Sequence, residues 1–509
     1  MSLSHKSLGD CFASIVIKNP KKIAIVHASE GNLTYKELDD SSNKFYEFIR
    51  KNNKQRERPV LIFDDKSLNL YSAILGCIKL GKPYLVVDTD TPAERLNIII
   101  KETQAEFLII NRSYEALVVG NIDQKISKYY FDTITKEVFL SDLLEKKAQA
   151  NSLSIAYIIF TSGSTGKPKA IPISHANLYP FINWSHEEFS ISSNSVCTSL
   201  NQPFFDNFVF DFYCTIFNGA TLISFNKSEL NNLQNVYKRI VKNNVTHWFS
   251  VPSLLIFYQA LGFFKNEIVS LKKVIFGGEG YPIPKLKKLI DDIETYDKTK
   301  QLYNVYGPSE CTCMCSSMLI KESLLNGDGY HPIGKISDYF KWYLETEKND
   351  IDQIEGVLCL AGQSVSKGYI NRSDDKSFFK KNSRLFYRTG DIFKIDHRGD
   401  LNFVAREDFQ IKRMGYRVDL IEVEHTLNKL ECVSETVVVS HMKNDLSYIT
   451  AFFSPNKFKD FDINDVQNFL RKNLPKYMLP NKIESIENIK KNANGKIDRS
   501  YYQELAESK

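Results

Sequence analysis

One loop, residues 161–169, is made of residue types that could do chemistry directly. It reads TSGSTGKPK and follows the apolar run at residues 155–160. Glycines let backbone N–H groups approach an anion, and the hydroxyl and ammonium groups add donors and positive charge. The spacing differs from the Walker A motif, which needs Gly in place of Thr161 and Ser or Thr in place of Pro168. We expect a nucleotide-phosphate-binding loop behind a buried strand, and the alternative is a flexible Gly/Ser linker.

The overall composition is that of a large globular protein. With 509 residues, 43% hydrophobic and 25% charged, the chain is too long for one ordinary domain. The formal net charge is only +5, and no basic stripe interleaved with aromatic residues argues for nucleic-acid binding. The first residues lack a signal-peptide core, and no apolar run approaches the roughly 20 residues of a membrane helix. We expect a cytoplasmic monomer that does not span a membrane.

The nine cysteines favour a reduced protein over a disulfide framework or a metal site. Their number is odd, and they are scattered through a long chain. Only Cys311, Cys313 and Cys315 cluster, with the alternate spacing of one strand face. A zinc site would need a C-x₂-C pair and a second ligand pair, and the sequence has neither.

Apolar runs alternate with amphipathic stretches over most of the chain. The strand-like runs lie at residues 24–26, 59–63, 84–87, 107–110 and 274–276, and the helix-like segments include residues 68–80 and 92–102. This alternation predicts α/β architecture with largely parallel sheets. After about residue 335, shorter strands with Gly turns predict a barrel-like β section.

The pattern also predicts two domains of unequal size. A large N-terminal domain would cover residues 1–405, and residues 406–408 would connect it to the remainder. Residues 409–509 again read as α/β and are about as long as a small domain.

Five further segments fall in a fixed order along the chain. They are LTYKEL at 33–38, NVYGPSE at 304–310, GQSVSKGY at 362–369, YRTGD at 387–391 and NGKIDR at 494–499. Together with the TSGSTGKPK loop, this set resembles the adenylate-forming superfamily, which includes acyl-CoA synthetases, luciferases and amino-acid adenylation domains. The resemblance covers essentially the whole chain and is greatest to the amino-acid adenylation branch.

The resemblance implies ATP and Mg²⁺ as cofactors and a role for each matching residue. Tyr306 would stack on adenine, and Asn304 would hydrogen-bond to the adenine edge. Glu310 would bind Mg²⁺, since hard oxygen ligands suit that ion. Asp391 would accept both ribose hydroxyls, with Arg406 near the ribose and phosphate. The nucleotide-binding residues implied in this way are Thr161, Ser162, Gly163, Ser164, Thr165, Gly166, Lys167, Asn304, Tyr306, Gly307, Ser309, Asp391 and Arg406.

Two more residues carry the catalytic cycle that the resemblance implies. Lys496 would be the catalytic lysine, whose charge stabilises the transition state as a carboxylate attacks the α-phosphorus. Asp408 would be the hinge about which the small C-terminal domain swings between two poses. One pose would present Lys496, and the other would present the strand and loop around Gly415 and Tyr416 to open a tunnel for a thiol.

The substrate class depends on Asp206, which follows Phe205 in the segment QPFFDNFVFD at residues 202–211. In the amino-acid branch this Asp pairs with the substrate α-ammonium, and a buried carboxylate needs such a cation. The alternative is that Asp206 caps or orders a loop. Phe208 departs from the branch, where a small Ser is common. The other substrate-lining residues implied by the resemblance are Phe210, Phe249, Gly277, Val305, Cys313 and Met314.

The resemblance thus implies an AMP-forming ligase that activates an amino acid and transfers it to the phosphopantetheine thiol of a separate carrier protein. Bulky lining residues favour a small or medium apolar side chain, and residues 246–253 resemble the D-alanine-activating members, so D-alanine is the first guess. A carboxylic-acid–CoA ligase of the same fold is the alternative enzyme, and indifference to the loss of Asp206 would favour it. A non-catalytic nucleotide-binding relic is the alternative without an activity, and the intact set of Lys496, Glu310 and Asp391 argues against it.

Overall fold

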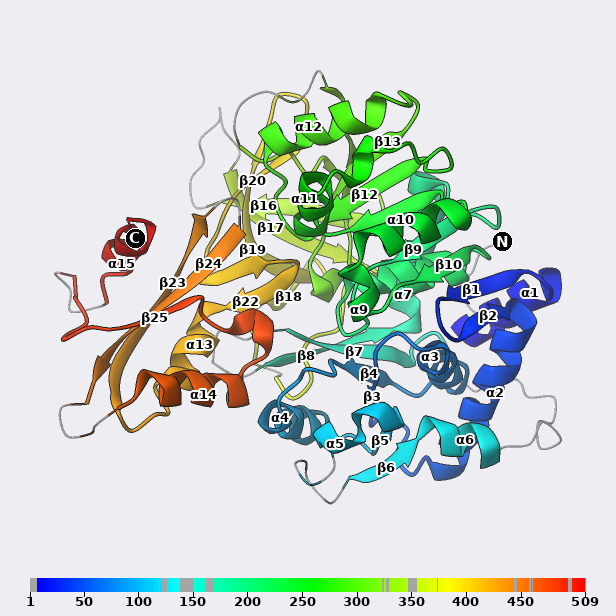
Figure 1. The fold of residues 1–509 in the computed structure, drawn as a ribbon, viewed down its shortest axis with the longest axis horizontal. Helices are drawn as coiled ribbons and strands as arrows, with labels where there is room; N and C mark the ends of the chain where they lie inside the picture. The colour runs from blue at the N-terminus through cyan, green and yellow to red at the C-terminus, as the bar shows by residue number, and fades with distance from the viewer. Residues whose placement is uncertain are drawn as a thin grey trace.

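A computed structural model gives the fold as a large unit followed by a smaller one, which lies at the left of Figure 1. The structure describes residues 7–118, 120, 122, 126–137, 150–161, 168–322, 325, 329–346, 355–372, 374–443, 446–456, 459, 461–492 and 497–508. Among these residues, no helix is both long and apolar enough to cross a lipid bilayer.

The first layer of the large unit is a six-stranded sheet in the order β6-β5-β3-β4-β7-β8. Its strands are β3 (Val60–Phe63), β4 (Tyr84–Val87), β5 (Phe107–Ile110), β6 (Ser127–Tyr130), β7 (Ile155–Thr161) and β8 (Lys169–Ser174). All neighbours are parallel except β7 and β8. The connecting helices are α3 (Leu68–Leu80), α4 (Ala93–Thr103), α5 (Glu115–Val118) and α6 (Phe131–Glu137). This sheet confirms the predicted βα alternation.

A nine-stranded sheet forms the second layer, in the order β15-β14-β13-β12-β11-β9-β10-β1-β2. Its strands are β1 (Ile23–His27), β2 (Gly31–Thr34), β9 (Val196–Ser199), β10 (Thr221–Ser224), β11 (His247–Ser250), β12 (Lys273–Gly277), β13 (Gln301–Tyr306), β14 (Ser316–Leu319) and β15 (Lys335–Ile336). The associated helices are α1 (Leu8–Lys18), α2 (Tyr35–Asn52), α7 (His175–Phe189), α8 (Asn207–Val209), η3 (Phe210–Cys214), α9 (Lys227–Leu230), α10 (Leu233–Lys242), α11 (Pro252–Ala260), η4 (Phe263–Lys265), α12 (Ile283–Glu294) and η5 (Ser309–Cys311).

Aromatic packing between the two layers explains Phe208, the residue that departs from the adenylation branch. Phe208 is buried, and its ring stacks on Tyr71 of α3 at 6.0 Å and on Phe212 at 5.8 Å between centroids. Such stacked rings add to the free energy gained by burying their area. Phe208 therefore belongs to the core that ties α3 to the segment carrying Asp206.

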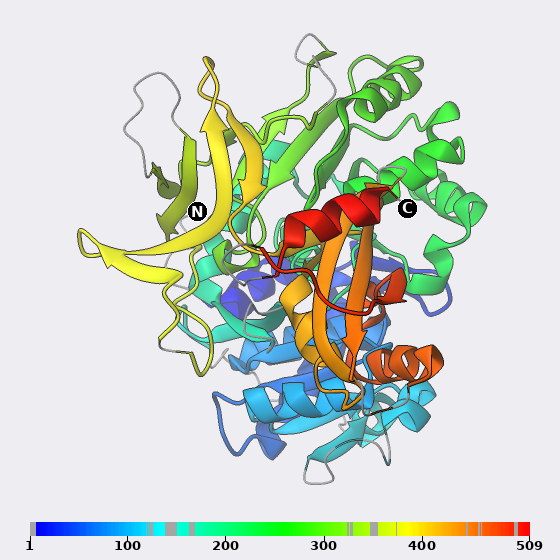
Figure 2. The same cartoon turned by 90° about the vertical axis from the view of Figure 1, so that its left-hand side faces the viewer.

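The predicted barrel-like section is a strongly curved antiparallel sheet (Figure 2), in the order β16-β17-β19-β18 with β20 paired to β19. Its strands are β16 (Phe340–Glu345), β17 (Glu355–Gly362), β18 (Phe378–Lys381), β19 (Arg384–Ile395) and β20 (Leu401–Arg406). Asp391 on β19 and Arg406 at the end of β20 are register partners, so they lie directly opposite each other on neighbouring antiparallel strands.

The smaller unit begins with a two-stranded hairpin and continues with a three-stranded sheet. The hairpin is β21 (Gln410–Arg413) and β22 (Tyr416–Asp419), and the sheet is β23 (Val433–Lys443), β24 (Leu446–Pro455) and β25 (Lys482–Ser485). Helices α13 (Leu420–Leu427) and α14 (Ile463–Asn473) pack on one face, and α15 (Arg499–Glu507) packs on the other. The short helix η7 (Lys476–Met478) follows α14. Figure 1 shows α14 beside α4 of the large unit, with α15 on the far side of the sheet.

Candidate active site

Two cavities meet where the β21–β22 hairpin enters the large unit. Cavity 1 has a volume of about 110 Å³, and cavity 2 has a volume of about 400 Å³. The residues that line both cavities are Gly278, Val305, Asp391, Arg406 and Lys412. Because Lys412 belongs to the hairpin and the others to the large unit, the site is completed by both parts of the chain.

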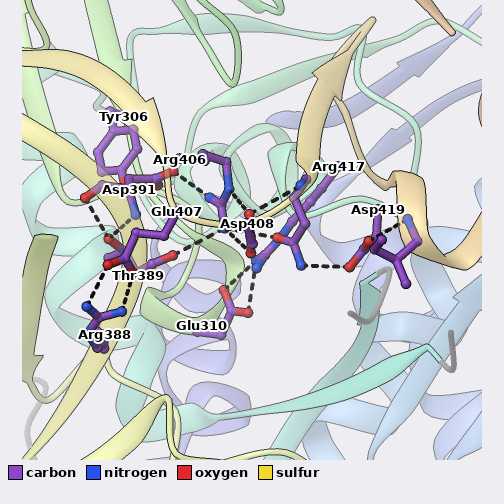
Figure 3. A network of polar contacts seen from close by, with 12 residues as sticks. Tyr306, Glu310, Arg388, Thr389, Asp391, Arg406, Glu407, Asp408, Arg417 and Asp419 are labelled. Atoms are coloured by element: carbon purple, nitrogen blue, oxygen red, sulfur yellow. Dashed lines mark hydrogen bonds and ion pairs between the residues drawn. The ribbon is translucent and has the colours of Figure 1, made fainter. Parts of the chain in front are cut away.

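Asp391 is held between an aromatic hydroxyl and a guanidinium, as Figure 3 shows. Tyr306 Oη donates to Asp391 Oδ2, and Arg406 Nη1 donates to Asp391 Oδ1, each at 2.5 Å. The Asp391 side chain is only 4% exposed. Arg406 Nε also donates to Asp408 Oδ1 at 2.7 Å. The side chains implied for ribose and adenine binding therefore lie together, beside the implied hinge residue.

Glu310 is fully buried and forms an ion pair with the hairpin. Arg417 Nη1 lies 3.0 Å from Glu310 Oε1 and 3.1 Å from Oε2 (Figure 3). Tyr369 Oη also donates to Glu310 Oε1, at 2.7 Å. Burial alone would raise the pKa of Glu310, but the Arg417 charge and the Tyr369 hydrogen bond hold that pKa below its usual value. In this pose, the Arg417 guanidinium contacts the Glu310 carboxylate, which the resemblance implies as the Mg²⁺ ligand.

Asp206 lies in cavity 1 and has no hydrogen bond to cap the short helix that follows it. Ser309 Oγ donates to Asp206 Oδ2 at 2.5 Å, and burial raises the pKa of Asp206. The positive charge of Lys412 acts against this shift, and the pKa of Lys412 is itself lowered by burial. Lys412 Nζ also lies 5.2 Å from the centroid of the Tyr306 ring. The Asp206 side chain therefore makes no cap to this helix, whereas its hydrogen bond with Ser309 does order the segment, and its carboxylate lies in the wall of cavity 1.

Part of the wall of cavity 1 is an unusual turn at Thr312 and Cys313. Thr312 and Cys313 both have positive φ, +61° and +77°, which non-glycine residues rarely adopt. A Cβ on Gly307 would lie 2.4 Å from the Cys313 carbonyl oxygen, so the turn packs directly against the glycine. The tight contact places Cys313 and Met314 in the wall of cavity 1.

The structure brings most of the expected site residues together. Those lining cavity 1 are Thr161, Asp206, Gly277, Val305, Gly307, Ser309, Cys313, Met314, Asp391 and Arg406. Asn304 and Tyr306 line cavity 2, where Asn304 Nδ2 donates to the Pro332 carbonyl at 2.8 Å. Phe210 and Phe249 do not line cavity 1; their rings pack on each other at 4.7 Å in the core. Residues 162–167 of the loop and Lys496 lie outside the described residues.

Sequence reasoning missed two cationic residues of the hairpin, Lys412 and Arg417. A signal was present, because residues 410, 412 and 417 place polar and basic side chains in a strand pair directly after the expected hinge. What the sequence does not reveal is that Arg417 meets Glu310, which lies 107 residues earlier in the chain.

Two family models match this chain in order. The family model described as AMP-binding enzyme matches residues 12–370, and the AMP-binding enzyme C-terminal domain model matches residues 422–496. The chain is 31% identical to the D-alanine–D-alanyl carrier protein ligase of Bacillus velezensis, over 92% of this chain and 93% of that protein. It is also 30% identical to part of bacitracin synthase 1 of Bacillus licheniformis, over 97% of this chain and 9% of the synthase.

Solved structures share the fold at lower sequence identity. The o-succinylbenzoate CoA synthetase of Bacillus subtilis superposes with a TM-score of 0.84 at 18% identity, covering 98% of this chain and 99% of that one. The adenylation domain AlmE of Vibrio cholerae, in complex with glycyl-adenosine-5'-phosphate, gives 0.80 at 20% identity, covering 98% and 97%. A CoA synthetase and an adenylation domain thus match equally well, so the fold alone does not separate the two branches. With both family models matched in order, this chain belongs to the AMP-binding enzyme family.

Proposed function

We propose that this protein is an ATP-dependent, AMP-forming ligase that activates an amino acid and loads it onto a carrier protein. The observation that carries the proposal is the half-buried carboxylate of Asp206, which lines the same cavity as Asp391 and Arg406. The relatives named D-alanine–D-alanyl carrier protein ligase make D-alanine the first candidate substrate. We further propose that the protein works as a cytoplasmic monomer, with its carrier protein in trans.

In the first half-reaction, a carboxylate oxygen of the amino acid attacks the α-phosphorus of ATP. An O–P bond forms as the bond to the β-phosphate oxygen breaks, and pyrophosphate leaves. Asp206 pairs with the α-ammonium and so orients the carboxylate, while Asp391 accepts the ribose hydroxyls. Lys496 stabilises the charge that develops at the phosphate.

Glu310 would supply a hard oxygen ligand for Mg²⁺, whose charge would neutralise the phosphates during adenylation. One carboxylate fits that ion, because Mg²⁺ keeps several waters and phosphate oxygens as its other ligands. In the described pose, Arg417 engages both oxygens of Glu310. We therefore assign adenylation to a second pose, in which the hairpin has left Glu310.

The described pose suits the second half-reaction. The phosphopantetheine thiol attacks the carbonyl carbon of the aminoacyl adenylate, so that a C–S bond forms and the C–O bond to the phosphate breaks. AMP leaves, and the thiol proton passes to solvent. The hairpin places Lys412 in the shared wall of both cavities with Asp391 and Arg406, where its positive charge would stabilise a leaving phosphate.

Replacing Lys496 with alanine tests the division into two half-reactions. We expect amino-acid-dependent ATP–pyrophosphate exchange to fall by about 100-fold or more, because a charge aimed at the transition state is lost. Transfer from supplied aminoacyl adenylate to the carrier should keep its rate. The matched control is Lys491→Ala, which removes a half-exposed lysine paired with Glu435 on the surface. Unchanged exchange in Lys496→Ala would contradict the role assigned to Lys496, and a wild-type protein without exchange would favour a non-catalytic protein.

Replacing Asp408 with proline tests the hinge. Proline fixes φ, so a backbone that must rotate at this residue is held in one pose. We expect one half-reaction to be lost and the other to keep its rate, measured by pyrophosphate exchange and by carrier loading from supplied adenylate. Equal rates to wild type in both assays would place the hinge elsewhere.

A further inference from the structure

The motif GQSVSKGY leads into a segment that lies along the outer edge of strand β8. We call residues 366–372 and 374–377 the strap, and the loop at residues 161–169 the phosphate loop. Strand β8 is the last strand of the six-stranded sheet, so its outer backbone groups need partners from elsewhere in the chain. Ile370 N donates to the Ala170 carbonyl of β8 at 2.9 Å. The strap therefore covers the edge of the strand in which the phosphate loop ends.

Polar contacts with the strap fix the last two residues of the phosphate loop. Lys169 Nζ lies 2.8 Å from Asp375 Oδ2, and the two side chains are only 11% and 14% exposed. Ser377 N donates to Asp375 Oδ1 at 2.9 Å, which orients that carboxylate. Arg372 Nη2 donates to the Pro168 carbonyl at 3.2 Å. Because the ion pair is shielded from water, removing the charge of one partner leaves the other without compensation.

The strap also contacts Glu310, and this second contact gives it a role. Lys169 Nζ lies 4.7 Å from the centroid of the Tyr369 ring, and Tyr369 Oη donates to Glu310 Oε1 at 2.7 Å. Ser366 N donates to the Glu310 backbone carbonyl at 2.8 Å. Tyr369 and Glu310 both belong to the large unit, so these contacts do not require the smaller unit. One segment thus links the end of the phosphate loop to the carboxylate that would hold Mg²⁺.

We propose that Asp375 is a positioning residue, which through Lys169 holds the phosphate loop in register with Glu310 so that the site binds the β- and γ-phosphates of ATP. The inference rests on the proposed function and deepens it, because it assigns a strap residue to the recognition of ATP over AMP. A loop whose end is already fixed loses less conformational freedom when it binds a ligand, so the ion pair lowers the cost of binding the phosphates. AMP lacks the β- and γ-phosphates, so its affinity does not depend on this pair.

The test measures the binding of ATP with Mg²⁺, and of AMP, to full-length Asp375→Asn by equilibrium titration without an amino acid, together with KM for ATP in pyrophosphate exchange. The variant keeps the shape of the side chain and removes the charge that pairs with Lys169. We expect Kd and KM for ATP to rise about tenfold, while Kd for AMP stays within about twofold of wild type. Carrier loading from supplied aminoacyl adenylate should also stay within about twofold, because that substrate has no β- or γ-phosphate. Asp375→Glu, which keeps the charge, should restore most of the ATP affinity.

Asp374→Asn is the matched control, because it removes an exposed carboxylate one residue away from Asp375. It should leave the affinities for ATP and AMP unchanged. The proposal is overturned if ATP and AMP binding weaken equally in Asp375→Asn, which would show a general structural role. It is also overturned if ATP binding stays the same or tightens, which would show that Lys169 acts on the phosphates without Asp375. A wild-type protein that binds ATP but exchanges with no amino acid overturns the proposed function instead, and the comparison of ATP with AMP binding still decides the role of Asp375.

Discussion

In Asp206→Ala, we expect kcat/KM for amino-acid-dependent ATP–pyrophosphate exchange to fall by about 100- to 1,000-fold. The variant leaves the substrate α-ammonium without its carboxylate in a buried cavity, and an unpaired buried charge costs roughly 3–5 kcal/mol. Ser309 remains as a neutral acceptor only. Exchange assays with D-alanine and with propionate, its deamino analogue, measure the effect. Wild type should strongly prefer alanine, and the variant should lose that preference.

The propionate comparison separates recognition from folding. A variant that misfolds loses exchange with both acids, whereas a lost ammonium partner affects only alanine. Asp40→Ala is the control, since Asp40 pairs with Lys36 on the surface of α2. If Asp206→Ala still preferred alanine over propionate as strongly as wild type does, another residue would bind the ammonium.

Arg417→Gln should have the second large effect, and on the other half-reaction. Its guanidinium is the described cation paired with the fully buried Glu310 carboxylate, and removing one partner of such a pair costs about 3–5 kcal/mol. The cost falls on the described pose, because Glu310 can be solvated or bind Mg²⁺ when the hairpin moves away. We expect carrier loading to fall about 100-fold or more, with pyrophosphate exchange kept within about threefold.

Arg471→Gln is the matched control for Arg417→Gln, because it removes an exposed arginine of α14 in the same unit. Raising the Mg²⁺ concentration should lower carrier loading relative to pyrophosphate exchange, since Mg²⁺ and Arg417 compete for the Glu310 carboxylate. Loading should decline with Mg²⁺ in wild type once adenylate is supplied. Loading that is insensitive to both the substitution and Mg²⁺ would show that the ion pair does not stabilise the transfer pose.

Much of the fold follows from local pattern. Strands β3, β4 and β5 are short, fully buried runs, as expected of parallel strands covered on both faces, and α3 ends at Gly81, whose φ of +71° suits a left-handed cap. The motif spacing also placed Tyr306, Asp391 and Arg406 in one site. The strands and the helix cap depend on residues that are close together in the chain. The order of the sequence motifs predicted that Tyr306, Asp391 and Arg406 share one site.

The remaining features depend on contacts that local pattern does not encode. Phe210 and Phe249 were expected to line the pocket, yet they pack on each other in the core. The Arg417–Glu310 pair and the contact of the Phe205 ring with the Tyr416 ring depend on where one unit docks on the other. Two poses of the same chain would pair these side chains differently, so residue spacing alone cannot specify the pairing.

The most direct test of the account is amino-acid-dependent ATP–pyrophosphate exchange on the purified protein. The panel should contain both enantiomers of the common amino acids with a few fatty and aryl acids. The account predicts strong exchange with one small amino acid, D-alanine first, and far weaker exchange with acids that lack an α-amino group. Exchange only with such acids would contradict the role of Asp206 and make the protein a carboxylic-acid–CoA ligase.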